Sequence, residues 1–172
     1  MNLIIETNRL ILRTFNHEDA SLIYDLNHDP DVTQYTHDPV RDLNQAAEIL
    51  EKVILPQYTL YRLGRWAVHL KTTLGFIGWC GLKYRIEDNE IDLGYRFKKE
   101  FWGKGFATEA AIACIKYGFD VLNLKRIVGR AESENKASIA VLLKCGMFYI
   151  GEGEVDGYPV ITYEISNPGL LK

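Results

Sequence analysis

Cysteine is scarce in this chain of 172 residues, and its three cysteines show none of the paired spacings that are typical of metal or redox sites. This odd number and unpaired spacing predict that Cys80, Cys114 and Cys145 are reduced thiols and that the protein is cytoplasmic. Cys114 falls within an apolar helical pattern, which indicates a packing role. The four histidines also lack metal-ligand spacing, so we assign no metal.

The chain also lacks a charge excess and long hydrophobic runs. Its net charge is −3, whereas nucleic-acid-binding domains carry a basic surface. No apolar run reaches the length of a membrane span, and the first residues lack the basic region and cleavage site of a signal peptide. The composition argues against nucleic-acid and membrane partners, and it predicts a single globular domain over residues 1–172.

Hydrophobic periodicity outlines the secondary structure. Strands are expected over residues 9–14, 66–70, 76–82, 91–97, 126–130, 148–151 and 160–165. Helices are expected after Asn16, from Asp42 to a stop at Pro56, and over residues 107–122 and 137–144. Hairpins are expected around residues 72–73 and across residues 153–157.

The order of these elements predicts the fold class. A helix between the strands at 91–97 and 126–130 makes those two strands parallel, with a right-handed crossover. We expect an α/β (α+β) fold with a mixed central sheet of about six or seven strands and helices on both faces. The parallel pair should lie near the centre of the sheet.

The most informative stretch is Trp-Gly-Lys-Gly-Phe-Ala-Thr-Glu-Ala, residues 102–110, between a predicted strand and a predicted helix. Gly103 and Gly105 allow the backbone to approach a ligand closely. The free N–H groups of the helix's first turn, together with the helix dipole, favour an anion there. This is the chemistry of a phosphate cradle, although the pattern is neither a P-loop nor a complete dinucleotide fingerprint. A simple capping role for the glycines is the alternative.

At these residues the chain resembles the GCN5-related N-acetyltransferases (GNATs). Their pyrophosphate loop follows the pattern [QR]xxGx[GA], which is filled here by Trp102, Gly105 and Ala107. Trp at the first position departs from that pattern. In this respect the loop resembles that of the Rim-type branch, which acetylates the N-termini of ribosomal proteins. The segment Glu-Thr-Asn-Arg-Leu-Ile-Leu-Arg at 6–13 and the segments 135–138 and 144–146 also resemble that branch.

The resemblance implies that acetyl-CoA is the cosubstrate and lies in a gap between the two parallel strands. The pyrophosphate would be bound by the loop residues Gly103, Lys104, Gly105, Phe106, Ala107 and Thr108. The pantetheine amides would pair with the strand residues Leu93, Gly94, Tyr95, Arg96 and Phe97. Asn135 and Ser138 fall in a segment that touches the pantetheine in the family, although both residue types also cap helices.

The family's usual reaction is a direct attack of an amine on the thioester. Asp92 is the expected general base, acting through water, with Glu90 as its same-face neighbour. A structural role for Asp92 is the alternative. Leu142 stands where many relatives carry a tyrosine that protonates the leaving thiolate. Ser138 is the best replacement in this sequence, and Tyr95 is a weaker one.

The acceptor is less well defined by the sequence. In the family, two acidic segments would flank the acceptor groove: Asp29, Asp31, Asp38 and Asp42 in the first, and Glu152, Glu154 and Asp156 in the second. Such a mouth suits a cationic acceptor, although ordinary loop polarity explains these residues equally well. We expect acetylation of a protein or peptide N-terminal amine. A polyamine or amine antibiotic as acceptor, and a non-catalytic CoA-binding regulatory module, are the alternatives, and both a monomer and a homodimer remain open.

Overall fold

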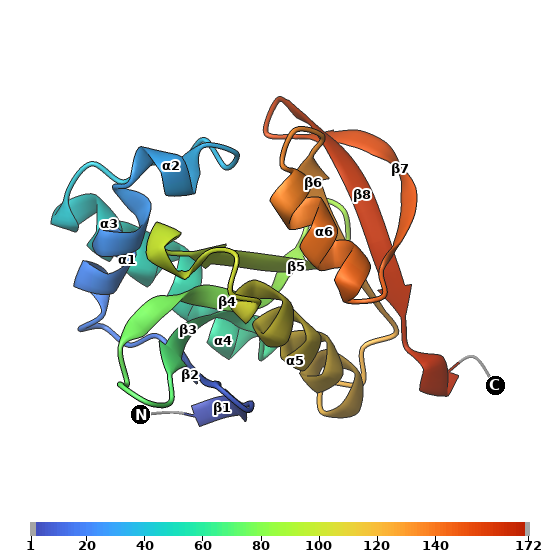
Figure 1. Cartoon of the computed structure of the whole chain (residues 1–172), viewed down its shortest axis with the longest axis horizontal. Coiled ribbons are helices and arrows are strands. Elements are labelled where there is room, and N and C mark those ends of the chain that lie inside the picture. Colours follow the sequence, from blue (N-terminus) through green and yellow to red (C-terminus); the bar gives the residue numbers. More distant parts are fainter. Residues whose placement is uncertain (1–2, 171–172) are drawn as a thin grey trace.

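The computed structural model describes residues 3–170, which form one eight-stranded mixed sheet with the strand order β1-β2-β3-β4-β5-β6-β8-β7 (Figure 1). The strands are β1 (Leu3–Glu6), β2 (Leu10–Thr14), β3 (Gly64–Leu70), β4 (Phe76–Arg85), β5 (Glu90–Phe97), β6 (Arg126–Glu132), β7 (Phe148–Val155) and β8 (Tyr158–Ser166). The helices are α1 (Ala20–Asn27), α2 (Pro30–Thr33), α3 (Leu43–Ile49), the π-helix η1 (Leu50–Ile54), α4 (Leu55–Tyr61), α5 (Phe106–Asp120) and α6 (Lys136–Lys144). Short 3-10 turns, η2 (Lys99–Phe101) and η3 (Pro168–Leu170), complete the set.

Strands β1 to β5 follow one another in antiparallel order, and β5 pairs in parallel with β6. The hairpin between β3 and β4 closes through a hydrogen bond from the Leu70 N–H to the Gly75 carbonyl oxygen, 3.0 Å long. The parallel pair lies in the interior of the sheet, as expected. Beyond it, β8 inserts between β6 and the edge strand β7.

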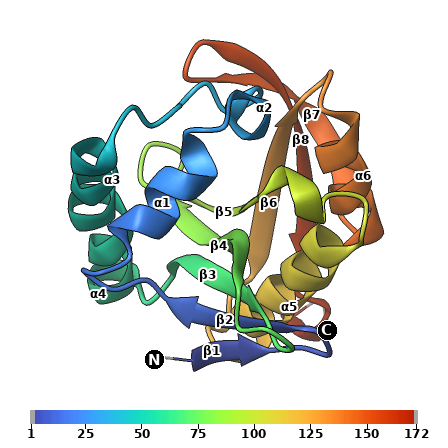
Figure 2. The ribbon, with the colours of Figure 1, turned by 60° about the vertical axis from the view of Figure 1, so that its left-hand side comes forward.

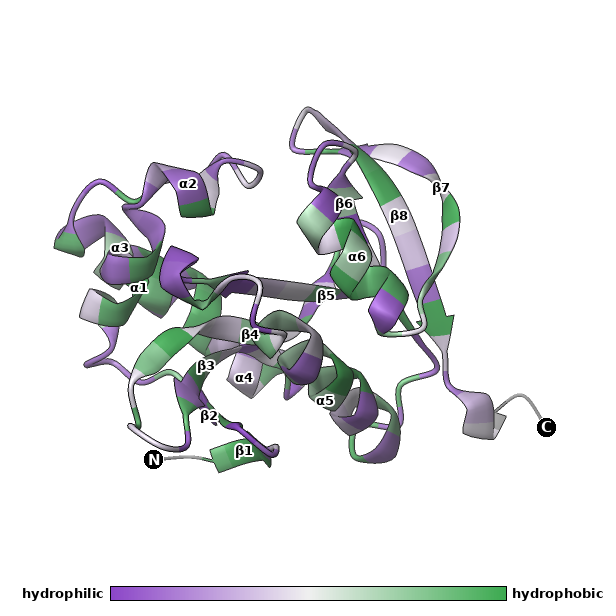
Figure 3. Ribbon diagram, in the orientation of Figure 1, coloured by the Kyte–Doolittle hydropathy of each residue, from purple (hydrophilic) through white to green (hydrophobic). Residues whose placement is uncertain are grey.

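Helices cover both faces of the sheet, which confirms the expected fold class. Helices α1, α3 and α4 lie on one face, and α5 and α6 lie on the other (Figure 2). The apolar stretches of α5 alternate with polar ones (Figure 3), and its buried residues are Ala110, Ala111, Cys114, Ile115 and Gly118. We call the face that carries α5 and α6 the α5 face, and the opposite one the α1 face.

Two expected boundaries differ from the structure. Asn16 does not cap α1, because the helix begins only after Asp19, whose carboxylate accepts from the Asn16 N–H at 2.8 Å. Pro56 does not end the second helix, which continues from Leu43 to Tyr61 through η1. Proline lacks an N–H and crowds the preceding turn, and the wider π-helical turn before it accommodates both effects.

The sheet also has one strand more than the six or seven expected. β1 pairs with β2 through a register that shifts between Leu3 and Ile5. The segment is short, its pattern of exposure does not alternate, and its pairing depends on the fold rather than on local periodicity. The final hairpin is likewise longer than expected, because β7 and β8 extend to a tight turn at residues 156–157.

Candidate functional site

The two parallel strands separate soon after they meet. β5 and β6 are in register only at Asp92 opposite Val128 and Leu93 opposite Gly129. β5 continues to Phe97, whereas β6 continues alongside β8 alone. Within the described residues, the edge of β5 from Gly94 onward therefore has no strand partner on this side, and its backbone groups are available to a ligand.

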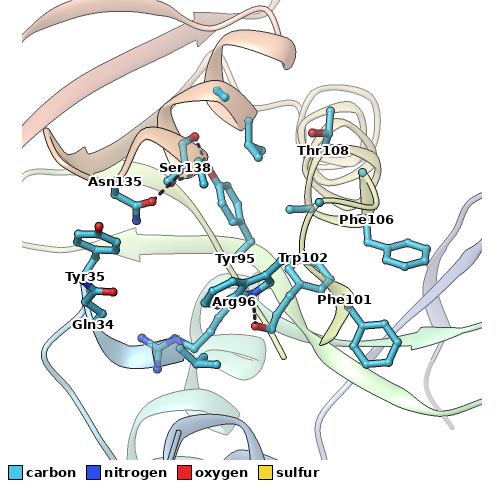
Figure 4. A pocket seen from close by; sticks show the side chains of 18 of the residues that line it. Gln34, Tyr35, Tyr95, Arg96, Phe101, Trp102, Phe106, Thr108, Asn135 and Ser138 are labelled. Atoms are coloured by element: carbon cyan, nitrogen blue, oxygen red, sulfur yellow. Dashed lines mark hydrogen bonds between the residues drawn. The ribbon is translucent and has the colours of Figure 1, made fainter. Parts of the chain in front are cut away.

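A cavity of about 550 Å³ opens beside this separation. Its walls come from β5, from the start of α5, from α6 and from the segment around α2 (Figure 4). The predicted site residues that line it are Tyr95, Arg96, Phe97, Gly103, Gly105, Phe106, Ala107, Thr108, Asn135 and Ser138. Gln34, Tyr35 and Thr36 face them from the opposite wall. The fold therefore brings three separate stretches of the predicted site around one cavity.

The glycines of the loop have the backbone conformation that a cradle requires. Gly103 and Gly105 have φ angles of 71° and 79°, in the left-handed region that disfavours other residues. Gly105 is the N-cap of α5 and provides no side-chain hydrogen bond to the first turn. The N–H groups of that turn, at the cavity wall, are left for an anion.

A clamp of three side chains, Thr7, Arg9 and Glu109, holds this loop from behind. The Glu109 carboxylate accepts from the Thr7 hydroxyl at 2.7 Å, from the Arg9 N–H at 2.9 Å and from Arg9 Nε at 2.6 Å. Arg9 Nη1 donates to the carbonyl oxygen of Lys104 at 3.0 Å. The Arg9 guanidinium also lies 4.4 Å from the ring centroid of Phe106. The clamp thereby joins the two motifs at 6–13 and 102–110.

Three of the predicted cofactor residues do not line the cavity. The ammonium of Lys104 lies 5.6 Å from the ring centroid of Phe101. Lys104 contacts the clamp through its carbonyl oxygen, which accepts from Arg9. Leu93 is buried in the core. A side chain at Gly94 would meet the indole of Trp79, which fills that part of the α1 face. Contacts of these three residues with a cofactor stay predictions.

A hydroxyl pair forms the α6 side of the cavity. The Tyr95 and Ser138 hydroxyls are 2.8 Å apart, and Tyr95 also donates to the Ser138 carbonyl oxygen at 3.0 Å. Burial raises the pKa of Tyr95, so its phenol is protonated at neutral pH. Asn135 caps α6 by accepting from the Ser138 N–H at 3.1 Å. The capping role considered for Asn135 is therefore present, while its side chain still borders the cavity (Figure 4).

Leu142 explains why the usual tyrosine has no counterpart at that position. Its side chain is buried and packs over Gly129, where a side chain would meet Leu142 Cδ2 at 2.6 Å. Ser138, one turn earlier, lines the cavity, whereas Leu142 does not. The Tyr95 hydroxyl reaches the place beside Ser138 from the strand instead.

Asp92 lies on the α1 face, where the parallel strands separate. Burial raises the pKa of its carboxyl to about 6, although Arg130 opposes the shift. Asp92 Oδ1 lies 3.6 Å from Arg130 Nη1, and neither atom has a hydrogen-bond partner. Glu90, the alternative base, is instead paired with Arg126 and Arg130. A carboxyl with a pKa of about 6 is mostly ionised at neutral pH and is more basic than an ordinary aspartate, which suits general-base chemistry better than the paired Glu90 does.

The thiols and histidines serve other purposes. Cys80 and Cys114 are buried with their sulfur atoms 3.5 Å apart, and burial raises the pKa of Cys80. Burial also raises the pKa of Cys145 to about 12, so it is a poor nucleophile. His37 pairs with Glu132 at 2.6 Å and stacks on Tyr158. Within residues 3–170, no three His, Cys, Asp or Glu side chains are grouped as metal ligands.

The site can be compared with known proteins. A family model described as an acetyltransferase (GNAT) domain matches residues 9–148. The "uncharacterized N-acetyltransferase p20" of Bacillus licheniformis is 37% identical over 79% of this chain and 77% of its own length. The spermidine N(1)-acetyltransferase of Escherichia coli K12 is 26% identical over 82% of this chain and 74% of its own. The crystal structure of ribosomal-protein-S5-alanine acetyltransferase from Vibrio fischeri superposes with a TM-score of 0.78, at 20% identity, over 95% of this chain and 96% of that one.

The chain belongs to the GNAT family of acetyltransferases. It is an acyltransferase that moves an acetyl group from acetyl-CoA to an amine. None of the helices within residues 3–170 has the length and apolarity that a bilayer crossing requires.

Proposed function

We propose that this acetyltransferase acetylates the primary amine of a protein or peptide N-terminus, by direct attack of the amine on acetyl-CoA. The observation that carries the proposal is the separation of β5 from β6 beyond Leu93. The cavity lies beside this gap, with α5 and α6 in one wall and the segment around α2 in another, and Asp92 lies on the α1 face where the strands separate. Two reactants can therefore meet in the gap from opposite faces without a covalent enzyme intermediate.

The residues around the cavity fit acetyl-CoA, which supplies an activated acetyl thioester. First-turn N–H groups of α5, with Gly103 and Gly105, would hold the pyrophosphate. The unpaired edge of β5 from Gly94 to Phe97 would bind the pantetheine amides. Asn135 and Ser138 border the same arm from α6.

Two protons must move during the transfer, and the chain offers a group for each. Asp92, ionised above pH 6, would take the proton of the incoming ammonium through a water molecule. On the other face, the protonated Tyr95 phenol, hydrogen-bonded to Ser138, would donate to the departing thiolate. This assignment gives Tyr95 the principal role and leaves Ser138 to orient its hydroxyl.

The acidic residues of the first segment already have partners in the fold and do not form a free acidic site for a polyamine. Asp29 and Asp42 cap helices, Asp31 pairs with Lys99, and Asp38 pairs with Arg96 at 2.8 Å. Their negative charge is therefore already compensated within the fold. Glu152, Glu154 and Asp156 in the final hairpin are exposed and form no such ion pairs within the described residues, so they are the acids that remain for a polyamine.

Release of free thiol from acetyl-CoA, followed with a panel of amines, tests the proposal. The panel contains peptides with a free N-terminus, the same peptides blocked at the N-terminus, spermidine and an aminoglycoside. We expect thiol release with the free peptides alone, and mass spectrometry should place one acetyl group on the α-amine. Turnover of spermidine but of no peptide would replace the proposed acceptor. Binding of CoA without release for any amine would contradict catalysis.

A further inference from the structure

Two cations flank the base on the α1 face. In the register of the sheet, Arg65 on β3 lies opposite Gly81, and Lys83 on β4 lies opposite Asp92. Gly81 in turn lies opposite Gly94. Side chains two residues apart on a strand share a face, so Arg65 and Lys83 stand on the face of Asp92, where the Trp79 indole covers the Gly94 position.

Arg65 and Lys83 have no anionic partner. Within residues 3–170, neither forms an ion pair or donates a side-chain hydrogen bond, whereas the neighbouring arginines on this face do. The Arg65 guanidinium lies 4.9 Å from the ring centroid of Trp79. Arg96 lies 5.8 Å from that ring as well, so Trp79 contacts two cations. Contact with an aromatic ring does not replace a carboxylate, and positive charge is left uncompensated here.

The surroundings make this charge unfavourable in the free protein. Both side chains are half-buried. Burial lowers the pKa of Arg65, and repulsion from Arg96 lowers it further. Burial also lowers the pKa of Lys83, and repulsion from Arg65 adds to that effect. Partly desolvated cations that repel each other are stabilised when an anion binds between them.

The nearby acids cannot fill that place. Asp38 is paired with Arg96, and Glu90 is paired with Arg126 and Arg130. Asp92 is the remaining carboxyl, and within the described residues it forms no ion pair with Arg65 or Lys83 and lies beside Arg130 instead, with Oδ1 3.6 Å from Arg130 Nη1. The anion must therefore come from outside the chain.

We propose that Arg65 and Lys83 bind a carboxylate of the acceptor, so that the substrate is an amine that carries a carboxylate close to its amino group. The proposal rests on the proposed function, because it takes Asp92 as the point where the amine is received. Lys83 faces Asp92 across antiparallel strands, where Cβ atoms are only about 5 Å apart, and Arg65 stands one strand further away on β3. The amine and the carboxylate must accordingly belong to one amino acid or to two adjacent residues of a peptide.

Matched acceptors test the carboxylate requirement. The first pair is a free amino acid and its carboxamide, and the second is a peptide with aspartate or asparagine as its second residue. We expect wild-type kcat/KM to favour one acid over its amide by roughly 10- to 100-fold, as for a hydrogen bond to a charged group. A preference in the peptide pair agrees with the proposed acceptor, whereas a preference in the amino-acid pair alone keeps the carboxylate subsite and replaces that acceptor. Equal kcat/KM for acid and amide in both pairs would overturn the subsite.

Substitutions test whether the two cations create the preference. In K83Q and in R65Q, the ratio of acid to amide should fall toward one. K52Q removes one positive charge from a side chain that is 72% exposed, and it should keep the wild-type ratio. K83Q alone decides the matter if R65Q melts at a lower temperature, since Arg65 also packs on Trp79. A preference that survives in K83Q would overturn the assignment.

A binding measurement separates this inference from the proposed function. Calorimetry of the CoA-loaded enzyme with N-acetylglycine and with N-acetylglycinamide requires no turnover. We expect the wild type to bind the carboxylate compound at least roughly 10-fold more tightly than the amide. K83Q should bind the two compounds with equal affinity. Equal binding to the wild type would overturn the anion subsite even if thiol release is observed. Carboxylate-dependent binding without thiol release for any amine would contradict only the proposed function.

Discussion

Among single residues, Asp92 leads to the most specific prediction, which concerns the pH dependence of the reaction. Its pKa of about 6 means that the carboxylate form needed for a base is lost below that pH. We expect kcat/KM for the amine to fall along an acid limb near pH 6. D92N should lower turnover by roughly 10²- to 10⁴-fold and abolish this limb. Steady-state rates of both proteins from pH 5 to pH 9 provide the measurement.

The stability of D92N separates a base from a structural acid. The pKa of Asp92 in the folded chain is about 6 rather than 3.8, so its stabilising contribution is complete below about pH 4 and is lost as the pH rises through 6. Asparagine resembles the protonated form at every pH. D92N should therefore be more stable than the wild type above pH 7, by on the order of 3 kcal/mol for two pKa units, and equal to it near pH 4. A variant that is less stable and fully active at pH 7 would show a structural acid.

Arg9 is predicted to act on the cofactor from a distance. It holds the Lys104 carbonyl and Glu109, and it does not line the cavity. R9Q should raise the KM for acetyl-CoA roughly tenfold, because a loosened loop loses about 1.4 kcal/mol of binding. The KM for the amine should change little. R41Q, which changes an exposed arginine that contacts Gln45, serves as the control. A lower melting temperature with no change in the KM for acetyl-CoA would show that Arg9 has only a structural role.

The residues of the proposed site and of the clamp behind it differ in how far sequence could identify them. Gly103, Gly105 and Thr108 lie in one contiguous motif, and local backbone physics indicates their role. Arg9 and Glu109 are 100 positions apart, so their contact depends on how β2 lies against α5. The motif at 6–13 can be recognised in the sequence, but the sequence does not indicate that it contacts α5. The role of Asp92 was proposed from its strand and stays a prediction, and the burial that raises its pKa depends on the packing of the sheet.

At the scale of elements, the loop before α5 makes the cofactor site testable. G105D places a charged side chain where φ is 79° and where the pyrophosphate is expected. We expect G105D to bind no CoA by calorimetry, because the added carboxylate repels phosphate and the strained backbone moves the first-turn N–H groups. G157D is the matched control, since Gly157 has a φ of 84° and open space around it in the last hairpin. Both variants incur a similar strain of roughly 1–2 kcal/mol. Wild-type CoA affinity in a folded G105D protein would rule out the cradle.

Elements with strong local signals were predictable, and those shaped by their neighbours were not. α5 has regular apolar spacing, a glycine before it and Asn123 after it in the left-handed conformation. Pro56, by contrast, sits in a helix that continues because η1 widens the preceding turn. β1 exists because β2 offers it an edge. In both cases tertiary contacts outweigh the local preference of the sequence.

At the scale of the whole molecule, the chain consists of two parts that meet at one narrow junction. β1 to β5 carry α1, α3 and α4, while β6, β7 and β8 carry α6 (Figure 2). Two register positions, at Asp92 and Leu93, join the two parts of the sheet directly. Helix α5 packs on β4 and β5 and also contacts α6, so it supports the junction from one face. The proposed cofactor site lies between these parts.

A ligand in that gap should stabilise the entire fold. Ligand at 100 times its dissociation constant adds about 2.7 kcal/mol to the free energy of unfolding if it binds only the folded state. In a chain of this size, that corresponds to a rise in melting temperature of roughly 5–10 °C. Thermal unfolding with and without CoA provides the measurement, and amide hydrogen exchange should show slower opening of β6 and α6. G105D should show neither effect, whereas G157D should show both from a slightly lower starting temperature. Slower hydrogen exchange confined to β1–β5, with unchanged exchange in β6 and α6, would mean that the ligand contacts one part only and does not bridge the gap.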